Sequence, residues 1–190
     1  MPRLQEGLVL DADGLVDDCK SGRLSAYDRL YEAHGVRMKS IAFNLLGNVP
    51  DAEDAVQEAF LKIYRSVCGF KGEASFMTWI YRVLVNTCYD LLRSRRRREP
   101  EAGGTMTEAL GGCAAPNACA DHPLRLTLEQ SLKRLPERGR AVFLLFEVEG
   151  FRHREIAGIL NIAEGTSKSI LFEAKRELQR LMRTGNEARA

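Results

Sequence analysis

The sequence predicts an all-α protein made of two small helical domains joined by a flexible linker. Apolar residues recur at three- and four-residue spacing in both halves of the chain, which is the period of an amphipathic helix. Residues 99–123 contain four glycines and three prolines and show no helical period. Because a loop of this length is unusual inside one compact domain, we expect domains at residues 12–98 and 124–184.

The composition is that of a globular protein. The 190 residues are 45% hydrophobic and 28% charged. The longest apolar run, residues 141–146, is too short to cross a bilayer, and the first ten residues do not have the pattern of a secretory signal. Five scattered cysteines do not form a disulfide framework. We therefore expect a cytoplasmic protein that makes no membrane contact itself.

Charge is distributed unevenly along the chain. Residues 1–98 carry 15 Lys and Arg against 13 Asp and Glu, and residues 124–190 carry 13 against nine. The linker at residues 99–123 carries four acids and no basic residue. Two mildly basic domains around an acidic spacer indicate a polyanionic partner.

The first domain is expected to contain four helices. A short helix covers residues 14–20, and a second one, with apolar positions in residues 27–45, ends at Gly47. Asp51 is predicted to cap the third helix, and Ser75 is predicted to cap a long fourth helix. The apolar stripe of the third helix consists of Ala52, Ala55, Val56, Ala59, Phe60, Ile63, Tyr64 and Val67.

The second domain is also expected to be helical. Its first helix covers residues 124–135 and ends at Pro136, and a second helix covers residues 141–147. Two further helices follow, with a break at Asn161 between them. This pair has the form of a helix-turn-helix, a motif that places its second helix in the major groove of DNA.

Five short motifs are distributed over the two domains. The first domain contains Asp51-Ala-Glu-Asp-Ala-Val-Gln-Glu-Ala-Phe60 and Gly72-Glu-Ala-Ser-Phe-Met-Thr-Trp-Ile-Tyr-Arg82, followed by Asn86. The second domain contains Leu135-Pro-Glu-Arg138, Glu155-Ile-Ala-Gly-Ile-Leu160 and Gly165-Thr-Ser-Lys-Ser169. Together they resemble regions two and four of the extracytoplasmic-function (ECF) sigma factors of the sigma-70 family.

The resemblance implies a function and a set of partners. ECF sigma factors are transcription initiation factors, so the chain is expected to be no enzyme and to need no cofactor or metal. It is expected to bind bacterial core RNA polymerase and promoter DNA. Members of the family are commonly held inactive by an anti-sigma factor, so we expect one here as well.

The third helix is expected to expose a polar face opposite its apolar stripe. Asp54, Gln57 and Glu58 project there at helical spacing. Acids at a helix start also complement the helix dipole, which explains Asp51 and Glu53 but not the positions further along. The resemblance implies that Asp54, Gln57 and Glu58 bind the clamp of RNA polymerase.

The first domain carries further candidates for DNA contact. The resemblance implies that the loop with Phe70 and Lys71 captures an unpaired base of the minus-ten element. It also implies that Asn86 helps to read this element. Trp79 is interpreted as a core residue. The arginine run at residues 93–98 predicts phosphate binding, because a phosphate partner relieves the repulsion between adjacent like charges. The arginines assigned to this contact are Arg93, Arg95 and Arg96.

The helix-turn-helix carries the candidates for reading the minus-thirty-five element. The residues implied to meet base edges are Thr166, Lys168 and Ser169, and those suited to phosphates are Lys175 and Arg176. Ser167 stands where the family has a small apolar residue, so we expect Ser167→Val to raise thermal stability. Glu173 stands where relatives often carry Arg or His.

The cysteines are interpreted separately from the motifs. Cys113, Cys119 and His122 in the linker match no structural-zinc spacing, and we interpret them as a chance grouping. Cys68 and Cys88 fall on apolar faces and are predicted to be buried.

Two alternatives to an initiation factor stay open: an autonomous regulator that binds operators, and a sigma-like decoy that titrates polymerase or an anti-sigma factor.

Overall fold

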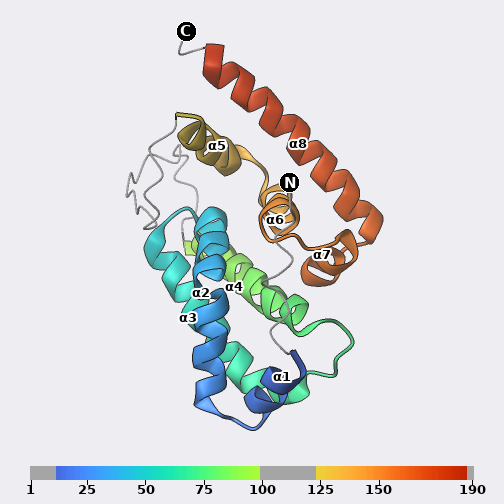
Figure 1. The fold of residues 1–190 in the computed structure, drawn as a ribbon. Coiled ribbons are helices and arrows are strands. Elements are labelled where there is room, and N and C mark those ends of the chain that lie inside the picture. Colours follow the sequence, from blue (N-terminus) through green and yellow to red (C-terminus); the bar gives the residue numbers. More distant parts are fainter. Residues whose placement is uncertain (1–11, 99–122, 188–190) are drawn as a thin grey trace.

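A computed structural model describes residues 12–98 and 123–187, which form helices joined by short loops (Figure 1). The first domain comprises α1 (Ala12–Lys20), α2 (Leu24–Leu46), α3 (Val49–Ser66), a 3-10 turn (Val67–Gly69) and α4 (Phe76–Arg98). The second comprises α5 (Pro123–Arg134), α6 (Glu137–Phe143), a π-helical turn (Leu144–Val148), α7 (His153–Leu160) and α8 (Glu164–Glu187). The described ranges contain no strand, so the predicted all-α fold is confirmed.

Capping residues set the ends of the helices in the first domain. Gly47 ends α2 in the left-handed region, at φ 86°. Asn48 caps α3, because its Oδ1 accepts a hydrogen bond from the backbone N–H of Asp51 at 2.9 Å. The prediction that Asp51 is the cap is therefore wrong, since the helix begins before it. Ser75 caps α4 as predicted, and its Oγ accepts from the backbone N–H of Thr78 at 3.1 Å.

The core of the first domain is apolar and lies between α2, α3 and α4. The stripe predicted on α3 points into it, and its buried members are Ala52, Ala55, Val56, Ala59 and Ile63, together with Val67 in the 3-10 turn. Tyr64 is instead 49% exposed, because it lies at the edge of the stripe and packs edge-on against Tyr27. Trp79 is half-buried against the core, which confirms its interpretation.

The second domain has the predicted helix-turn-helix, formed by α7 and α8. Asn161 breaks the chain between the two helices in the left-handed region, at φ 52°. Ser167 is fully buried, and its Oγ lies 3.0 Å from Nδ1 of His153 in α7. The hydroxyl that was expected to weaken packing therefore has a partner in the neighbouring helix.

The two domains pack against each other, and one apolar cluster continues through both. α7 lies against α4 (Figure 1). The ring of Tyr81 packs edge-on against Phe151 with ring centroids 5.0 Å apart, and its hydroxyl donates to Oε2 of Glu149 at 2.9 Å. In α6, the guanidinium of Arg140 donates to the backbone carbonyl of Asn44 at 2.9 Å. Sequence periodicity predicts the two helical units but contains no information about this contact.

Among the described helices, none has both the length and the apolar character that crossing a membrane requires. The same residues bring no three His, Cys, Asp or Glu side chains together as metal ligands. Cys113, Cys119 and His122 lie outside the described residues. Cys88 is buried as predicted, but the prediction for Cys68 is wrong: it is exposed, because it lies in the 3-10 turn after α3.

Candidate functional site

The polar face of α3 is open to solvent. Asp54, Gln57 and Glu58 are all exposed, on the side of the helix opposite its buried stripe. Glu58 Oε1 lies 4.0 Å from Nζ of Lys62, whereas Asp54 and Gln57 make no hydrogen bond or ion pair within the described part of the chain. This face is therefore free to meet a partner, and its charge favours a basic one.

Apolar side chains that the sequence analysis missed accompany this acidic face. Leu61 is 49% exposed and lies one helical turn after Gln57 and Glu58. On the neighbouring α2, Tyr31 is 56% exposed and rests edge-on against Phe60, with ring centroids 5.4 Å apart. Leu61 follows Gln57 and Glu58 by four and three residues, and this spacing alone places it on the same side of the helix. Acids mixed with exposed apolar groups are suited to a protein partner.

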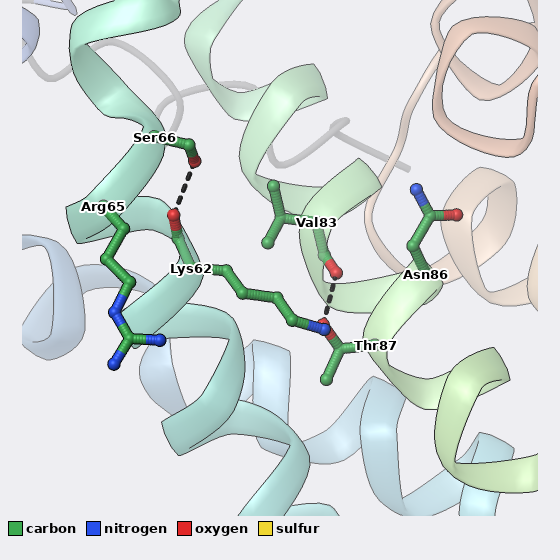
Figure 2. Close-up of a pocket in the computed structure, with 6 residues that line it drawn as sticks. All are labelled: Lys62, Arg65, Ser66, Val83, Asn86 and Thr87. Carbon is green, nitrogen blue, oxygen red and sulfur yellow. Dashed lines mark hydrogen bonds between the residues drawn. The ribbon is translucent and has the colours of Figure 1, made fainter. Parts of the chain in front are cut away.

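A surface pocket of about 400 Å³ lies between α3 and α4 (Figure 2). Its lining residues are Lys62, Arg65, Ser66, Val83, Asn86 and Thr87. Figure 2 shows the side chain of Lys62 reaching across from α3 to α4, where Nζ donates to Oγ1 of Thr87 at 3.2 Å. Nζ also lies 3.8 Å from Oδ2 of Asp90. The pocket thus has cations on one helix and hydroxyl and amide groups on the other.

Asn86 is the pocket residue that the sequence analysis selected. Its side chain is exposed and makes no hydrogen bond to another described residue, so both its donor and its acceptor are available. Arg65 was missed, because its place in the same pocket as Asn86 depends on how α3 packs on α4. A pocket lined by an amide and two cations has groups for a base edge and for a phosphate.

The two loop residues selected from the sequence have different surroundings. Phe70 is half-buried, and its ring centroid lies 5.4 Å from that of Phe76 and 5.5 Å from that of Trp79. Nζ of Lys20 lies 5.8 Å from the centroid of the Phe70 ring. Lys71 is exposed. Phe70 therefore belongs to an aromatic cluster in this structure, and Lys71 is the accessible member of the pair.

The three selected arginines at the end of α4 all have acidic partners. Arg93 lies 3.4 Å from Asp90 in the same helix. Arg95 pairs with Asp51 at 2.8 Å, and Arg96 pairs with Glu137 of the second domain at 2.6 Å. Their mutual repulsion is therefore partly offset within the chain. Exposed pairs of this kind contribute at most about 1 kcal/mol, so a phosphate can replace the carboxylates. The acidic partners are Asp90, Asp51 and Glu137.

The candidates in α8 are all exposed. They are Thr166, Lys168, Ser169, Lys175 and Arg176. Lys168 pairs with Glu164 at 2.7 Å. Lys175 pairs with Glu147 at 2.5 Å, and its Nζ lies 5.7 Å from the centroid of the Phe146 ring. The two lysines thus have partners within the domain, whereas Arg176 makes no ion pair with another described residue.

Comparison with known families gives two matches, one in each domain. Residues 30–98 match the model of sigma-70 region 2, and residues 125–178 match the model of sigma-70 region 4. The chain is 31% identical over 175 residues to the ECF RNA polymerase sigma-E factor of Escherichia coli K12, covering 85% of this chain and 88% of the relative. It is 29% identical over 177 residues to the RNA polymerase sigma-H factor of Pseudomonas aeruginosa, covering 88% and 92%.

Two solved structures share the fold. CnrH, solved in complex with the cytosolic domain of CnrY, matches with a TM-score of 0.69 and 22% identity, over 91% of this chain and 97% of CnrH. The sigma factor RpoE of Bartonella quintana, solved with the anti-sigma factor NepR, matches with a TM-score of 0.71 and 24% identity, over 83% and 96%. The likeness covers both domains of this chain.

Proposed function

Because this chain belongs to the sigma-70 family of transcription initiation factors, in its ECF group, we propose that its three exposed surfaces divide promoter recognition between them. The chain is not an enzyme: it binds core RNA polymerase and promoter DNA, and the polymerase synthesises RNA. We assign polymerase binding to the outer face of α3, the minus-ten element to the first domain and the minus-thirty-five element to α8. We place this work in the cytoplasm, where bacterial RNA polymerase acts.

The outer face of α3 is the observation that carries the polymerase assignment. Asp54 and Glu58 supply negative charge, Gln57 supplies an amide, and Leu61 supplies an apolar centre. Interface cores are commonly apolar with charged groups around them, and complementary charge speeds association. We infer that Asp54, Gln57 and Glu58 meet a basic surface of the polymerase.

The pocket between α3 and α4 supports the minus-ten assignment. Asn86 has a free amide for a base edge, and Lys62 and Arg65 line the α3 side of the same pocket and can bind phosphates. Exposed basic side chains also stand on either side of Asn86 along the chain: Lys71 in the loop before α4, and Arg93, Arg95 and Arg96 at the end of α4. A strand separated from its partner exposes base edges that such side chains can bind.

We also propose control by an anti-sigma factor. Both structural neighbours were solved with a bound protein: RpoE with the anti-sigma factor NepR, and CnrH with the cytosolic domain of CnrY. This chain has exposed apolar side chains on α2 that an inhibitor can cover, namely Leu24, Tyr31 and Val36. An inhibitor bound there lies close enough to α3 to compete with the polymerase, since α2 packs on α3.

Binding and run-off transcription with purified core polymerase test the proposal. The wild-type chain should co-elute with core enzyme and initiate at specific promoters. Reversing charge in the double variant Asp54→Lys, Glu58→Lys should raise the dissociation constant about tenfold or more. Asp17→Lys reverses the charge of one exposed acid on α1, away from α3, and should leave binding unchanged.

Other outcomes would favour the alternative functions. Operator binding without polymerase association would indicate an autonomous regulator. Polymerase binding without transcripts from any promoter library would indicate a decoy. Equal polymerase binding by the wild type and the double variant would remove the assignment of α3.

A further inference from the structure

The outward side of α8 forms a continuous stripe in the half of the helix that follows the turn. Ser169, Phe172, Glu173 and Arg176 are exposed and spaced at i, i+3, i+4 and i+7, so they lie on one side of the helix. The opposite side is buried and consists of Ser167, Leu171, Ala174 and Leu178. Helices that lie in the major groove present base-reading residues at this spacing. Phe172 is 66% exposed, so the stripe is not covered by the rest of the domain.

Glu173 in this stripe is an acid in basic surroundings. Lys168, Lys175 and Arg176 lie within five residues of it on α8, and residues 124–190 carry 13 basic residues against nine acids. This charge balance favours duplex DNA as the occupant of the face. A carboxylate on such a face is repelled by phosphates, so it opposes DNA binding unless it reaches a hydrogen-bond donor.

Glu173 also differs from the neighbouring acids of α8. Glu164 pairs with Lys168 at 2.7 Å, and Glu177 pairs with Arg180 through both carboxylate oxygens, at 2.6 and 2.9 Å. The hydrogen bonds from these partners hold the pKa values of Glu164 and Glu177 below their ordinary range. Glu173 forms no hydrogen bond or ion pair with another described residue. Its carboxylate is therefore available to an external donor.

The major groove offers donors from only two bases. Guanine presents N7 and O6, and thymine presents O4, so both show acceptors to an approaching carboxylate. Adenine presents its N6 amino group next to the N7 acceptor, whereas cytosine presents the N4 amino group without a neighbouring acceptor. An ionised carboxylate only accepts hydrogen bonds, so cytosine is its best match.

We propose that Glu173 is a specificity-determining residue that accepts a hydrogen bond from the N4 amino group of a cytosine in the upstream promoter element. This inference rests on the proposed function and adds the base that α8 selects. Arg176, one turn further along the stripe, offsets the charge of Glu173 and binds the adjoining phosphate. The upstream element should thus contain one position where cytosine is required.

Selection from a random duplex library tests the assignment, with the full chain bound to core polymerase. The wild type should enrich cytosine about tenfold over the other bases at one upstream position, which corresponds to about 1.4 kcal/mol. Glu173→Gln should shift the preference at that position to adenine, and Glu173→Arg should shift it to guanine. The other upstream positions should keep their preferences. Glu177→Gln removes a paired acid from the same helix and should leave the selected sequence unchanged.

A change in overall affinity alone would overturn the assignment. If Glu173→Gln and Glu173→Arg select the same bases as the wild type, Glu173 reads no base and acts only through its charge. If the wild type enriches no upstream sequence from the library, the assignment of a cytosine to Glu173 is also overturned. Co-elution of each variant with core polymerase is measured separately. If the wild type does not co-elute with core polymerase, the proposed function is contradicted. The Glu173 variants should all co-elute, because Glu173 lies outside α3.

Discussion

The two domains are both bundles of helices, but their buried polar groups are satisfied in different ways. In the first domain, Thr87 donates to the carbonyl of Val83 one turn earlier in its own helix. In the second, Ser167 contacts a different helix, and Arg140 donates to backbone carbonyls at the ends of α2 and α5. The Thr87 hydroxyl thus has its acceptor within its own helix, whereas Ser167 and Arg140 have their partners in other elements, which only the tertiary fold brings together.

This difference decides how each domain should respond to substitution. An apolar interior loses contacts in proportion to the volume removed, and its neighbours can partly relax. A polar contact between elements leaves its partners unsatisfied when one member is removed, and those partners stay buried. The second domain should therefore be the more sensitive to single polar substitutions, although fewer apolar residues are buried in it.

Arg140→Met should have the largest effect. The guanidinium donates to the carbonyls of Leu132 at 2.8 Å, Asn44 at 2.9 Å and Leu135 at 3.1 Å, and burial lowers its pKa. Removing it takes a charged donor from each of these carbonyls, so the free energy of unfolding should fall by about 4 kcal/mol. Urea denaturation of the full chain measures this change. Arg138→Met, at an exposed position in the same helix, is the control, and equal losses in the two variants would contradict the comparison.

Leu84→Ala should have a somewhat smaller effect in the first domain. Leu84 is fully buried in α4, and its truncation should lower the free energy of unfolding by about 3 kcal/mol through lost contacts and a cavity. Leu61→Ala, half-exposed on α3, is the matched control and should change stability by less than about 0.5 kcal/mol. A larger loss from Leu84→Ala than from Arg140→Met would reverse the order expected here.

The same distinction explains which features the sequence could predict. The apolar stripe of α3, the cap at Ser75 and the break at Asn161 depend on residues close together in the chain, and the sequence predicts them correctly. Asp51 is the predicted cap of α3, but Asn48 has the extended backbone and the side-chain contact that a cap requires. Local patterns thus locate the helices more reliably than their terminal residues.

Sequence reasoning also selected exposed residues for the site but not their partners. Arg95 and Arg96 were expected to repel each other until DNA bound, yet they pair with Asp51 and Glu137, which lie 44 and 41 residues away. Arg65 joins the pocket of Asn86 only because α3 packs on α4. These contacts depend on tertiary packing, which helical periodicity does not encode.

Ser167→Ala should lower the free energy of unfolding by about 1 kcal/mol, because it removes the contact between the buried hydroxyl and Nδ1 of His153. The sequence predicts that Ser167→Val raises thermal stability. With this contact present, we expect the opposite: Ser167→Val should also destabilise the domain. Thermal unfolding of both variants measures the effect. A double-mutant cycle with His153→Ala isolates the pair, and additive losses would show that the contact contributes nothing.

The smallest effect should appear at the contact between the domains, as a dependence of stability on pH. Burial raises the pKa of the Glu149 carboxyl, and the hydroxyl of Tyr81 and the charge of Arg37 oppose this shift. Because the folded chain then binds the proton more tightly than the unfolded chain, stability should rise as the pH falls through the folded pKa. The rise should end once the pH is below the unfolded value.

Two variants isolate this contribution from those of other titrating groups. Glu149→Gln should remove the contribution of Glu149 protonation. As the pH falls, the free energy of unfolding of the wild type should therefore increase relative to that of the variant. Tyr81→Phe removes a group that opposes the pKa shift, so its stability should rise more steeply on acidification. Parallel curves of stability against pH for all three proteins would show that Glu149 binds its proton equally well in the folded and unfolded chains. The contact between the domains would then be no more sensitive to protonation than the apolar interior of the first domain.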